Sequence, residues 1–471
     1  MYYGNKSRKI YLSFQEARLV LYKISLIYTG IMVDEQLVTN IPLPNTEDPD
    51  LLDPNSDPEH PKVIVFKEVK AASELIKDGI IYTPCEKSQL SLEYNMDIYF
   101  KKEFLQVTGS FKERGARNAL LQLTSEEAKR GVIACSAGNH ALGLAYHGSL
   151  LKIPITIIMP VNSSLMKQER CKKYGGLVLL KGNSVFESKL YASKIAKLNN
   201  LFLINGYDHP HILSGQGTIG VEILEQVPDV DAIIVPVGGG GLLAGLCVAV
   251  KSIRPEVMVV GVESNRCPGF QEALLAGKPV YTENRQSSAD GLAVSVVGVN
   301  SFETAHKLVD KMITIDETYI YRAVVRLLEF EKSVVECSGA TSLALIMANV
   351  LPELIGKKVV CILSGGNIDI STLSRVIDKG LALEGRLCRF IVVLNDRPES
   401  ISELCLILND IGANIKDISH ERIWSTSGIL QVQVKCTCEI QNASRRTDLE
   451  HALKTKYKHV IWGENELMIT Y

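Results

Sequence analysis

The chain has 471 residues, of which 46% are hydrophobic and 22% charged, so it has enough apolar material for large folded domains and is not a mainly disordered protein. Its 51 basic and 53 acidic residues leave a formal charge of -2, which gives no electrostatic footprint for nucleic acid. No apolar run approaches the roughly 20 residues of a membrane-spanning helix. We therefore expect small molecules as partners, and neither nucleic acid nor a membrane.

The eleven cysteines are scattered along the chain. They include no CxxC pair and no Cys/His spacing typical of zinc sites, and the closest two are Cys436 and Cys438. This pattern predicts reduced thiols and a cytoplasmic location. Among the first 30 residues, five of the six charged side chains are basic, which resembles an import peptide, so mitochondrial import is the alternative.

Residues 1–61 are predicted to form an N-terminal extension and a linker. Residues 34–61 are rich in Pro, Asp and Asn, and no helical or strand period survives there. We expect this segment to be irregular or disordered, with folded structure beginning near Lys62.

From residue 62 to residue 380, short β-branched runs alternate with helical patterns. Strands apolar on both faces and separated by helices predict a parallel α/β sheet covered on both sides. Ligands of such sheets bind beyond the carboxyl ends of the strands. The predicted strands are residues 131–136, 154–160, 201–206, 231–237, 257–263 and 358–364.

A run of four glycines follows the fourth of these strands, in "VPVGGGGLLAG". The run consists of Gly238, Gly239, Gly240 and Gly241. Backbone N–H groups without side chains, placed at the start of a helix, can turn inward on an anion. The pattern predicts a phosphate-binding loop, and a flexible loop is the alternative.

The same loop also admits a nucleotide interpretation. Gly239, Gly241 and Ala244 match the dinucleotide fingerprint G-x-G-x-x-A, and Glu263 ends the next strand, where an acid would hold a ribose. An NAD enzyme fits this stretch, but it leaves the other polar strand ends unexplained.

Two further strand ends carry small and polar residues. "SAGNHALG" offers the amide of Asn139, and "CILSGGN" offers the hydroxyl of Ser364. The alternatives are a helix N-cap for the first segment and an ordinary strand-to-helix turn for the second. His140 is interpreted as a structural histidine.

Lys112 lies at the predicted start of a helix, in "GSFKERGARNAL". Taken alone, it could be a solvated lysine in a charged helical turn. Together with a phosphate loop, an amide and a hydroxyl, it predicts a pyridoxal 5'-phosphate site, because that cofactor needs an amine for its Schiff base and N–H groups for its phosphate.

These motifs, with "GQGTIGVEI" and "SADGLAV", follow the order and spacing of the serine/threonine dehydratases over about residues 75–380. The resemblance implies the tryptophan-synthase β-subunit fold, an α/β architecture with two parallel-sheet subdomains. It implies that Lys112 forms the Schiff base and Phe111 packs beside the cofactor ring. It also implies cofactor contacts by Asn139, by Gly238, Gly239, Gly240, Gly241 and Leu242, and by Ser364, and substrate contacts by Ser136, Gly138 and Asn139.

The activity implied is a catabolic β-elimination of L-threonine or L-serine, or of both, which yields 2-oxobutanoate or pyruvate and ammonia. Lys112 would take the proton from the substrate Cα. Ser364 would contact the pyridine nitrogen, and a hydroxyl does not keep that nitrogen protonated, which disfavours transamination.

Two alternatives to a dehydratase remain. Serine racemases resemble this sequence but carry a serine where Ala137 stands, and alanine cannot transfer a proton. A catalytically inactive amino-acid sensor belongs to another class, and the intact Lys112 and Ser364 argue against it. A related cation site pairs an acid such as Glu263 with an aspartate six residues later, where this chain has Gly269, so we expect no metal.

Residues 385–471 are predicted to form a small α+β domain. The order strand, helix, strand, strand, helix, strand resembles an ACT domain, an amino-acid-sensing module. The family usually has glycine where Glu399 stands, and a carboxylate there competes for the N–H groups that would bind an anionic effector. We expect a module that serves mainly as an assembly surface of a homo-oligomer.

Overall fold

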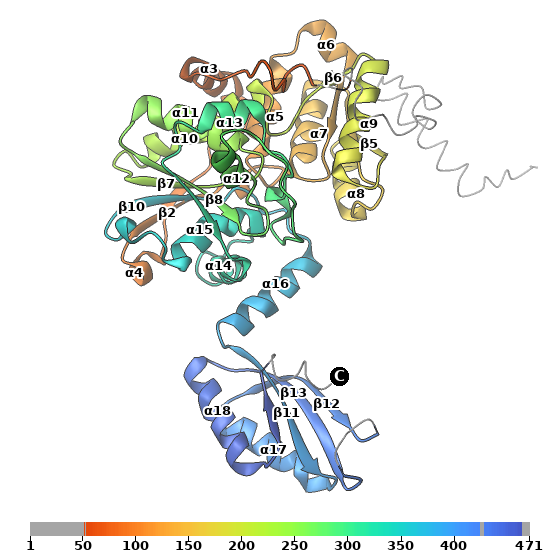
Figure 1. Cartoon of the computed structure of the whole chain (residues 1–471), viewed down its shortest axis with the longest axis vertical. Coiled ribbons are helices and arrows are strands. Elements are labelled where there is room, and N and C mark those ends of the chain that lie inside the picture. Colours follow the sequence, from red (N-terminus) through yellow and green to blue (C-terminus); the bar gives the residue numbers. More distant parts are fainter. Residues whose placement is uncertain (1–50, 52, 424–427, 464–471) are drawn as a thin grey trace, which may run out of the picture.

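The computed structural model describes residues 51, 53–423 and 428–463. Figure 1 shows two parallel sheets with their helices in the upper part of the molecule and an antiparallel sheet below, joined through helix α16 (Ile370–Leu383). The fold is the predicted α/β architecture with two parallel-sheet units and a small α+β unit.

The larger sheet has six strands in the order β1-β2-β10-β7-β8-β9. All neighbours are parallel except β1 and β2. β7 is buried on both faces because helices cover both sides of the sheet. The strands are β1 (Cys85–Lys87), β2 (Asp97–Lys101), β7 (Ala232–Pro236), β8 (Met258–Ser264), β9 (Lys311–Ile315) and β10 (Lys358–Ile362).

Two groups of helices cover the larger sheet. α14 (Glu317–Phe330) and α15 (Cys337–Ala348) pack on one face. The other face is covered by α3 (Phe66–Ile76), α10 (Pro210–Gln226), α11 (Gly241–Ile253), α12 (Gly269–Ala276) and α13 (Val299–Ala305).

The smaller sheet is fully parallel, in the order β5-β4-β3-β6. Helices α5, α7 and α8 lie on one face and α9 on the other. The strands are β3 (Val132–Cys135), β4 (Ile155–Met159), β5 (Leu177–Leu180) and β6 (Phe202–Leu203). The helices are α5 (Lys112–Leu121), α7 (Asn139–Leu151), α8 (Leu165–Lys173) and α9 (Val185–Leu198), and α4 (Ser91–Tyr94) and α6 (Ser125–Arg130) are short surface helices.

All six strands predicted for this part of the chain are confirmed. The prediction missed β1, β2, β5 and β9. β1 and β5, with three and four residues, are too short to show a period, and β2 and β9 contain charged or polar residues that break the continuous apolar pattern of a buried strand.

The C-terminal sheet has the predicted strand and helix order. Its strands β11 (Leu387–Asn395), β12 (Asn414–Glu421), β13 (Gln431–Glu439) and β14 (Val460–Trp462) pair antiparallel in the order β12-β13-β11-β14, with α17 (Pro398–Ile411) and α18 (Ala443–Lys456) packed against the sheet. The predicted last strand, residues 462–470, is wrong in its start, because β14 already begins at Val460. The rest of that prediction lies outside the described residues.

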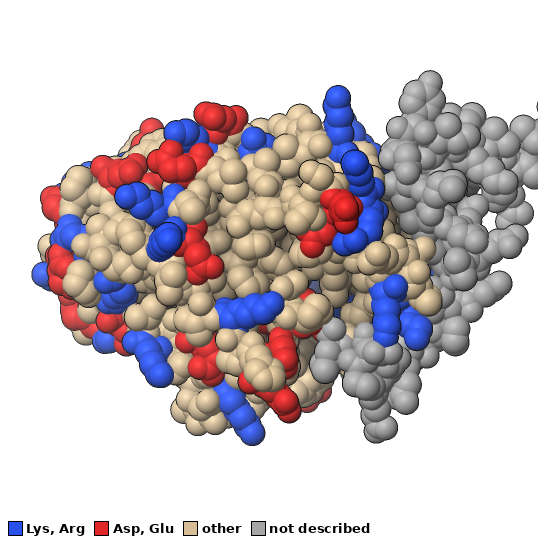
Figure 2. All heavy atoms as spheres, turned by 90° about the horizontal axis from the view of Figure 1, so that it is seen from above, with Lys and Arg blue, Asp and Glu red and all other residues tan. Residues whose placement is uncertain are grey.

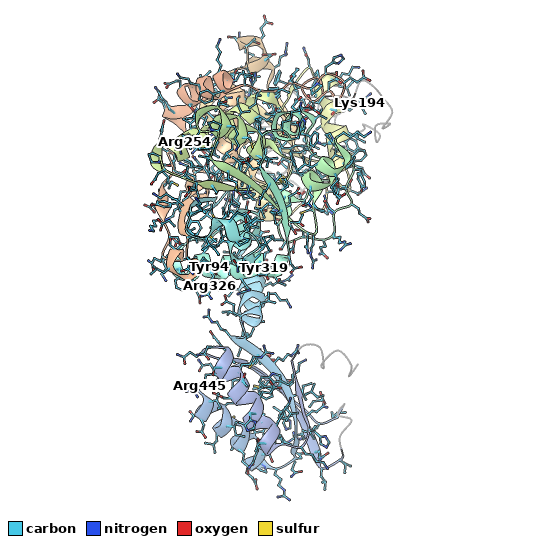
Figure 3. All side chains as sticks on the ribbon, turned by 60° about the vertical axis from the view of Figure 1, so that its left-hand side comes forward. Tyr94, Lys194, Arg254, Tyr319, Arg326 and Arg445 are labelled. Atoms are coloured by element: carbon cyan, nitrogen blue, oxygen red, sulfur yellow. The ribbon has the colours of Figure 1, made fainter. Side chains whose placement is uncertain are left out.

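Ion pairs connect the chain just after α16 to helix α14 of the larger sheet. Arg326 of α14 lies 3.0 Å from Glu384, and Arg386 donates to Glu329 at 2.6 Å. Figure 3 labels Arg326 beside Tyr94 and Tyr319, at the end of the upper, two-sheet part of the molecule nearest to α16. The connection is therefore held by charge pairs as well as by the chain itself.

Residues 53–61, the described end of the predicted linker, contain turns and bends and neither helix nor strand. They lie against helix α13, because Asn300 donates to the carbonyl of Asn55 and accepts from the N–H of Lys62. The rest of the predicted linker and the basic N-terminal stretch lie outside the described residues.

All eleven cysteines are free thiols, as predicted. Among the described helices, none is long and apolar enough to cross a membrane. On the face shown in Figure 2, lysine and arginine alternate with aspartate and glutamate, and no large area carries one sign of charge.

Candidate active site

Lys112 is the first residue of α5, as predicted. Its side chain is half-buried, and its Nζ donates to the carbonyl oxygen of Gly206. Burial lowers the pKa of Lys112 to about 8, so a neutral amine is accessible near neutral pH. The alternative of a solvated charged turn is wrong, because Glu113 and Arg114 are both fully buried.

The start of α5 is fixed to the end of β10. The N–H of Phe111 donates to the carbonyl of Ser364 at 3.0 Å, and Ser110 forms an isolated antiparallel bridge with Gly365. Lys112 Nζ lies 5.1 Å from the centre of the Phe111 ring. The structure therefore brings Lys112, Phe111 and Ser364 together from segments about 250 residues apart.

The four-glycine loop connects β7 to α11. Gly240 has a φ of +93°, in the left-handed region that favours glycine. A Cβ on Gly239 would lie 2.3 Å from Cγ of Tyr207, so no side chain fits there. The first N–H groups of α11 have no carbonyl partner within the helix, and with Leu242 they form a positive end suited to a phosphate.

Tyr207 connects the glycine loop to the lysine. It follows Gly206, which accepts from Lys112, and its ring packs on Gly239. The next residue, Asp208, accepts from the N–H groups of Val299 at 3.0 Å and Ser301 at 2.9 Å, which fixes this segment against α13. Lys112 and the glycine loop therefore both contact the segment formed by Gly206 and Tyr207.

Asn139 belongs to a hydrogen-bond network that the sequence did not reveal. Its Nδ2 donates to Oε1 of Glu336 at 2.8 Å, and its Oδ1 accepts from Nδ2 of Asn367 at 2.7 Å. The N–H of Asn367 in turn donates to Oε2 of Glu336 at 3.1 Å. The interpretation of Asn139 as a helix N-cap is wrong, because no side chain caps α7.

Glu336 and Asn367 are thus the residues missed by the sequence reasoning. Burial raises the pKa of Glu336 to about 7, so this carboxyl is partly protonated near neutral pH. Asn367 could have been found from its position in "CILSGGN", three residues after Ser364. Glu336 precedes α15 and is followed by small residues, which on the sequence alone is typical of an ordinary helix start.

The β3–α7 loop carries the predicted substrate residues. No atom lies within 4 Å of the position of a Cβ on Gly138, so there is open space beside this backbone. Ser136 Oγ accepts from the N–H of Gly138 at 3.3 Å. His140 is a structural histidine, as interpreted: its Nε2 pairs with the carbonyl of Ile204 at 3.2 Å, and burial lowers its pKa to about 3.

Glu263 does not face the glycine loop as a ribose-binding acid would. Its two carboxylate oxygens accept from the N–H groups of Phe270 at 2.7 Å and Gln271 at 3.0 Å at the start of α12, and the side chain is fully buried. Burial raises its pKa to about 8. The nucleotide interpretation is wrong, because the acid it requires caps a helix.

Comparisons with known proteins agree with this geometry. A family model described as pyridoxal-phosphate dependent enzyme matches residues 76–365. The L-threonine ammonia-lyase of Thermotoga maritima is 38% identical over 395 residues, which are 84% of this chain and 98% of that protein. Two solved structures are similar at a TM-score of 0.64: the processed form of threonine deaminase isoform 2 from Solanum lycopersicum (33% identity, 68% of this chain and 95% of that one) and maize serine racemase (31% identity, 68% and 99%). The chain therefore belongs to the pyridoxal-phosphate dependent enzymes.

Proposed function

We propose that the chain is an L-threonine ammonia-lyase that also accepts L-serine, giving 2-oxobutanoate or pyruvate and one ammonia per substrate. The observation that carries this proposal is the convergence of a half-buried amine, Lys112, with the glycine loop, Asn139 and Ser364 around one space. The similarity to L-threonine ammonia-lyases over 84% of the chain supports the choice of substrate.

The residues present fit pyridoxal phosphate. The glycine loop offers N–H groups with no room for side chains, and the neighbouring helix end adds positive potential. Lys112 would bond the cofactor, Phe111 and Asn139 would lie beside its ring, Leu242 would contribute an N–H to its phosphate, and Ser364 would contact its ring nitrogen. When bound, the cofactor supplies an aldehyde for amines and a ring that delocalises electrons from Cα.

Lys112 would act a second time as a base. Once free of its own bond, its Nζ would take the proton from the substrate Cα and, as an ammonium, would return a proton to the β-hydroxyl, which would leave as water. A pKa of about 8 suits this role, because the neutral amine is populated at the working pH and its conjugate acid remains a donor. Ser136, Gly138 and Asn139 would hold the substrate carboxylate beside the open space at Gly138.

A serine racemase is the second candidate, favoured by the similarity to the maize enzyme. Racemisation needs an acid on the face opposite Lys112, and this chain places Ala137 where racemases carry serine. The methyl group of alanine has no proton to give, so we favour elimination.

For the C-terminal unit, residues 385–471, we propose an ACT-like module that joins subunits. Within the described sheet, β12 is an edge strand, and it carries the partly exposed Ile415 and Ile418. An apolar edge strand is a ready surface for a second copy. We propose a homo-oligomer in the cytoplasm, consistent with the eleven free thiols.

The proposal is tested with Lys112→Ala in the purified protein. We expect the visible absorbance of the lysine-bound cofactor to disappear and ammonia release from L-threonine to fall by at least a hundredfold, since loss of a general base alone costs roughly 10² to 10⁴. Lys102→Ala, at a lysine that pairs with Glu86 on the surface, is the matched control. Turnover of Lys112→Ala within about tenfold of wild type would refute the assignment.

A further inference from the structure

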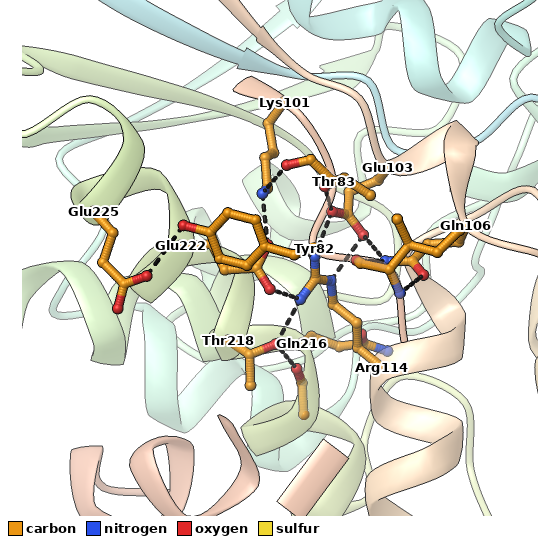
Figure 4. Close-up of polar contacts among 12 residues, drawn as sticks. Tyr82, Thr83, Lys101, Glu103, Gln106, Arg114, Gln216, Thr218, Glu222 and Glu225 are labelled. Atoms are coloured by element: carbon orange, nitrogen blue, oxygen red, sulfur yellow. Dashed lines mark hydrogen bonds and ion pairs between the residues drawn. The ribbon is translucent and has the colours of Figure 1, made fainter. Parts of the chain in front are cut away.

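A buried ionic cluster lies behind Lys112. We call its four charged residues, Lys101, Glu103, Arg114 and Glu222, the Arg114 cluster (Figure 4). Arg114 follows Lys112 by two positions on α5, and since a helix turns about 100° per residue, the two side chains leave the helix on opposite sides. The cluster therefore sits outside the cofactor space.

Every N–H donor of Arg114 is engaged. Two bonds run to Glu103 at 2.7 and 2.8 Å, two to Glu222 at 2.6 and 2.8 Å, and one to the hydroxyl of Thr218 at 3.1 Å. A guanidinium has five such donors in a rigid plane, so this set fixes both the position and the orientation of the side chain.

Lys101 completes the cluster. Its three N–H donors reach Glu222 at 2.6 Å, the carbonyl of Thr83 at 2.7 Å and the side-chain oxygen of Gln226 at 2.8 Å. Two cations thus balance two carboxylates in the interior. Burial by itself raises the pKa of Glu103, but attraction to Arg114 leaves that pKa below its ordinary value, so the pair is ionised.

The cluster joins three parts of the site. Arg114 belongs to the helix that begins at Lys112. Lys101 of β2 is the register partner of Ile362 of β10, two residues before Ser364. Glu222 belongs to α10, and the segment before that helix carries Gly206, the acceptor of Lys112.

Close packing between α5 and α10 leaves little freedom around this link. A Cβ on Gly215 would lie 2.7 Å from Cα of Gly115, and the N–H of Gly115 donates to Oε1 of Gln216 at 3.3 Å. The two helices touch at their backbones next to Arg114. Since Arg114 of α5 is bonded to Glu222 and Thr218 of α10, a shift of α5 along α10 would break these bonds.

We propose that the Arg114 cluster is a positioning device that holds α5, and with it the amine of Lys112, in register with the phosphate loop and Ser364. The inference rests on the role proposed above for Lys112. Arg114 is a positioning residue and touches no reacting atom. Stability alone does not require such a cluster, because buried ion pairs can often be replaced by apolar side chains at little cost.

The test uses the holoenzyme of the double variant Arg114→Met/Glu103→Gln, which removes one charge of each sign and leaves the pair of Lys101 and Glu222. We expect the cofactor to stay bound, because the phosphate loop is unchanged. We expect kcat to fall about 10- to 100-fold, since a misplacement of about 1 Å can cost a factor of 10². KM should stay within about threefold, and the visible circular dichroism per bound cofactor should change.

Ile320→Ala is the matched control for stability. Ile320 is fully buried on α14, on the opposite face of the larger sheet from α10. Its truncation should lower Tm while leaving kcat and the dichroism at wild-type values. A lower kcat with altered dichroism in the cluster variant, and neither change in the control, supports positioning.

Wild-type kcat and dichroism in the double variant, with only Tm lowered, would overturn the inference. If that variant does not fold, Arg114→Lys decides by the same readouts, because it keeps the charge but presents three donors in place of five. Wild-type kcat and dichroism in Arg114→Lys would overturn the inference as well. Failure of the proposed function is distinct, since it would appear as activity and cofactor absorbance retained in Lys112→Ala.

Discussion

The reactivity of Lys112 should have a pH dependence set by its burial. Desolvation lowers its pKa from 10.5 to about 8, because the surrounding protein disfavours the ammonium form. Only the neutral amine attacks an aldehyde. At pH 7.5 about a quarter of Lys112 is then neutral, against about one in a thousand for a lysine of ordinary pKa, an advantage of roughly 200-fold.

The assay mixes cofactor-free protein with pyridoxal phosphate in a stopped-flow instrument and follows the visible absorbance of the covalent product. We expect the bimolecular rate constant to rise about tenfold per pH unit from pH 6 and to level off above about pH 8, where the amine is already neutral. Nα-acetyl-lysine, which has a free ε-amine of ordinary pKa, is the control, and its rate constant should keep rising to about pH 10.

Lys112→Ala identifies the signal, because it should give no covalent product at any pH. A rate constant for the wild type that still rises tenfold per unit between pH 8.5 and 10 would refute the reasoning. Lys112 would then behave as a solvated lysine, and its contact with Gly206 would not hold it in a dry environment.

Three further predictions concern other parts of the chain. With L-serine, the wild type should give pyruvate and only traces of D-serine by chiral chromatography, and Ala137→Ser should raise that trace; comparable rates of both products would contradict the elimination mechanism. Gly239→Ala should weaken cofactor binding at least about tenfold in equilibrium dialysis, because the new Cβ lies 2.3 Å from the Tyr207 ring, and an unchanged Kd would show that the loop does not hold the phosphate. Deleting residues 385–471 should change the oligomeric mass in light scattering more than it changes inhibition by isoleucine or valine. An affinity shift of about 5- to 150-fold that the deletion removes and Glu399→Gly strengthens would instead reveal a working sensor.

The candidate cofactor site could be predicted from the sequence because its parts are local. A phosphate loop needs several glycines in a row after a strand, and a Schiff base needs a lysine, so residues 238–241 and Lys112 carry their chemistry in short motifs. The buried strands could be predicted for the same reason, since short continuous apolar runs such as residues 231–237 are typical of strands buried on both faces.

The contact partner of Glu336 could not be predicted from a local sequence pattern. Its carboxylate meets Asn139, which lies almost 200 residues earlier in the chain, and nothing within "VVECSGA" indicates that partner. Arg114 is similar, because in the sequence it looks like one charge of an exposed helical turn. Only packing shows that it is fully buried between two carboxylates.

The sequence by itself therefore predicted six of the parallel-sheet strands, the glycine loop and Lys112 as the candidate amine, because these predictions depend on residue type over a few neighbouring positions. Only the tertiary structure decided the direction of Lys112, its lowered pKa, and which carboxylates are buried as partners of Asn139 and Arg114. The physical reason is that burial, and with it the cost of each charge, is set by segments far apart in the chain.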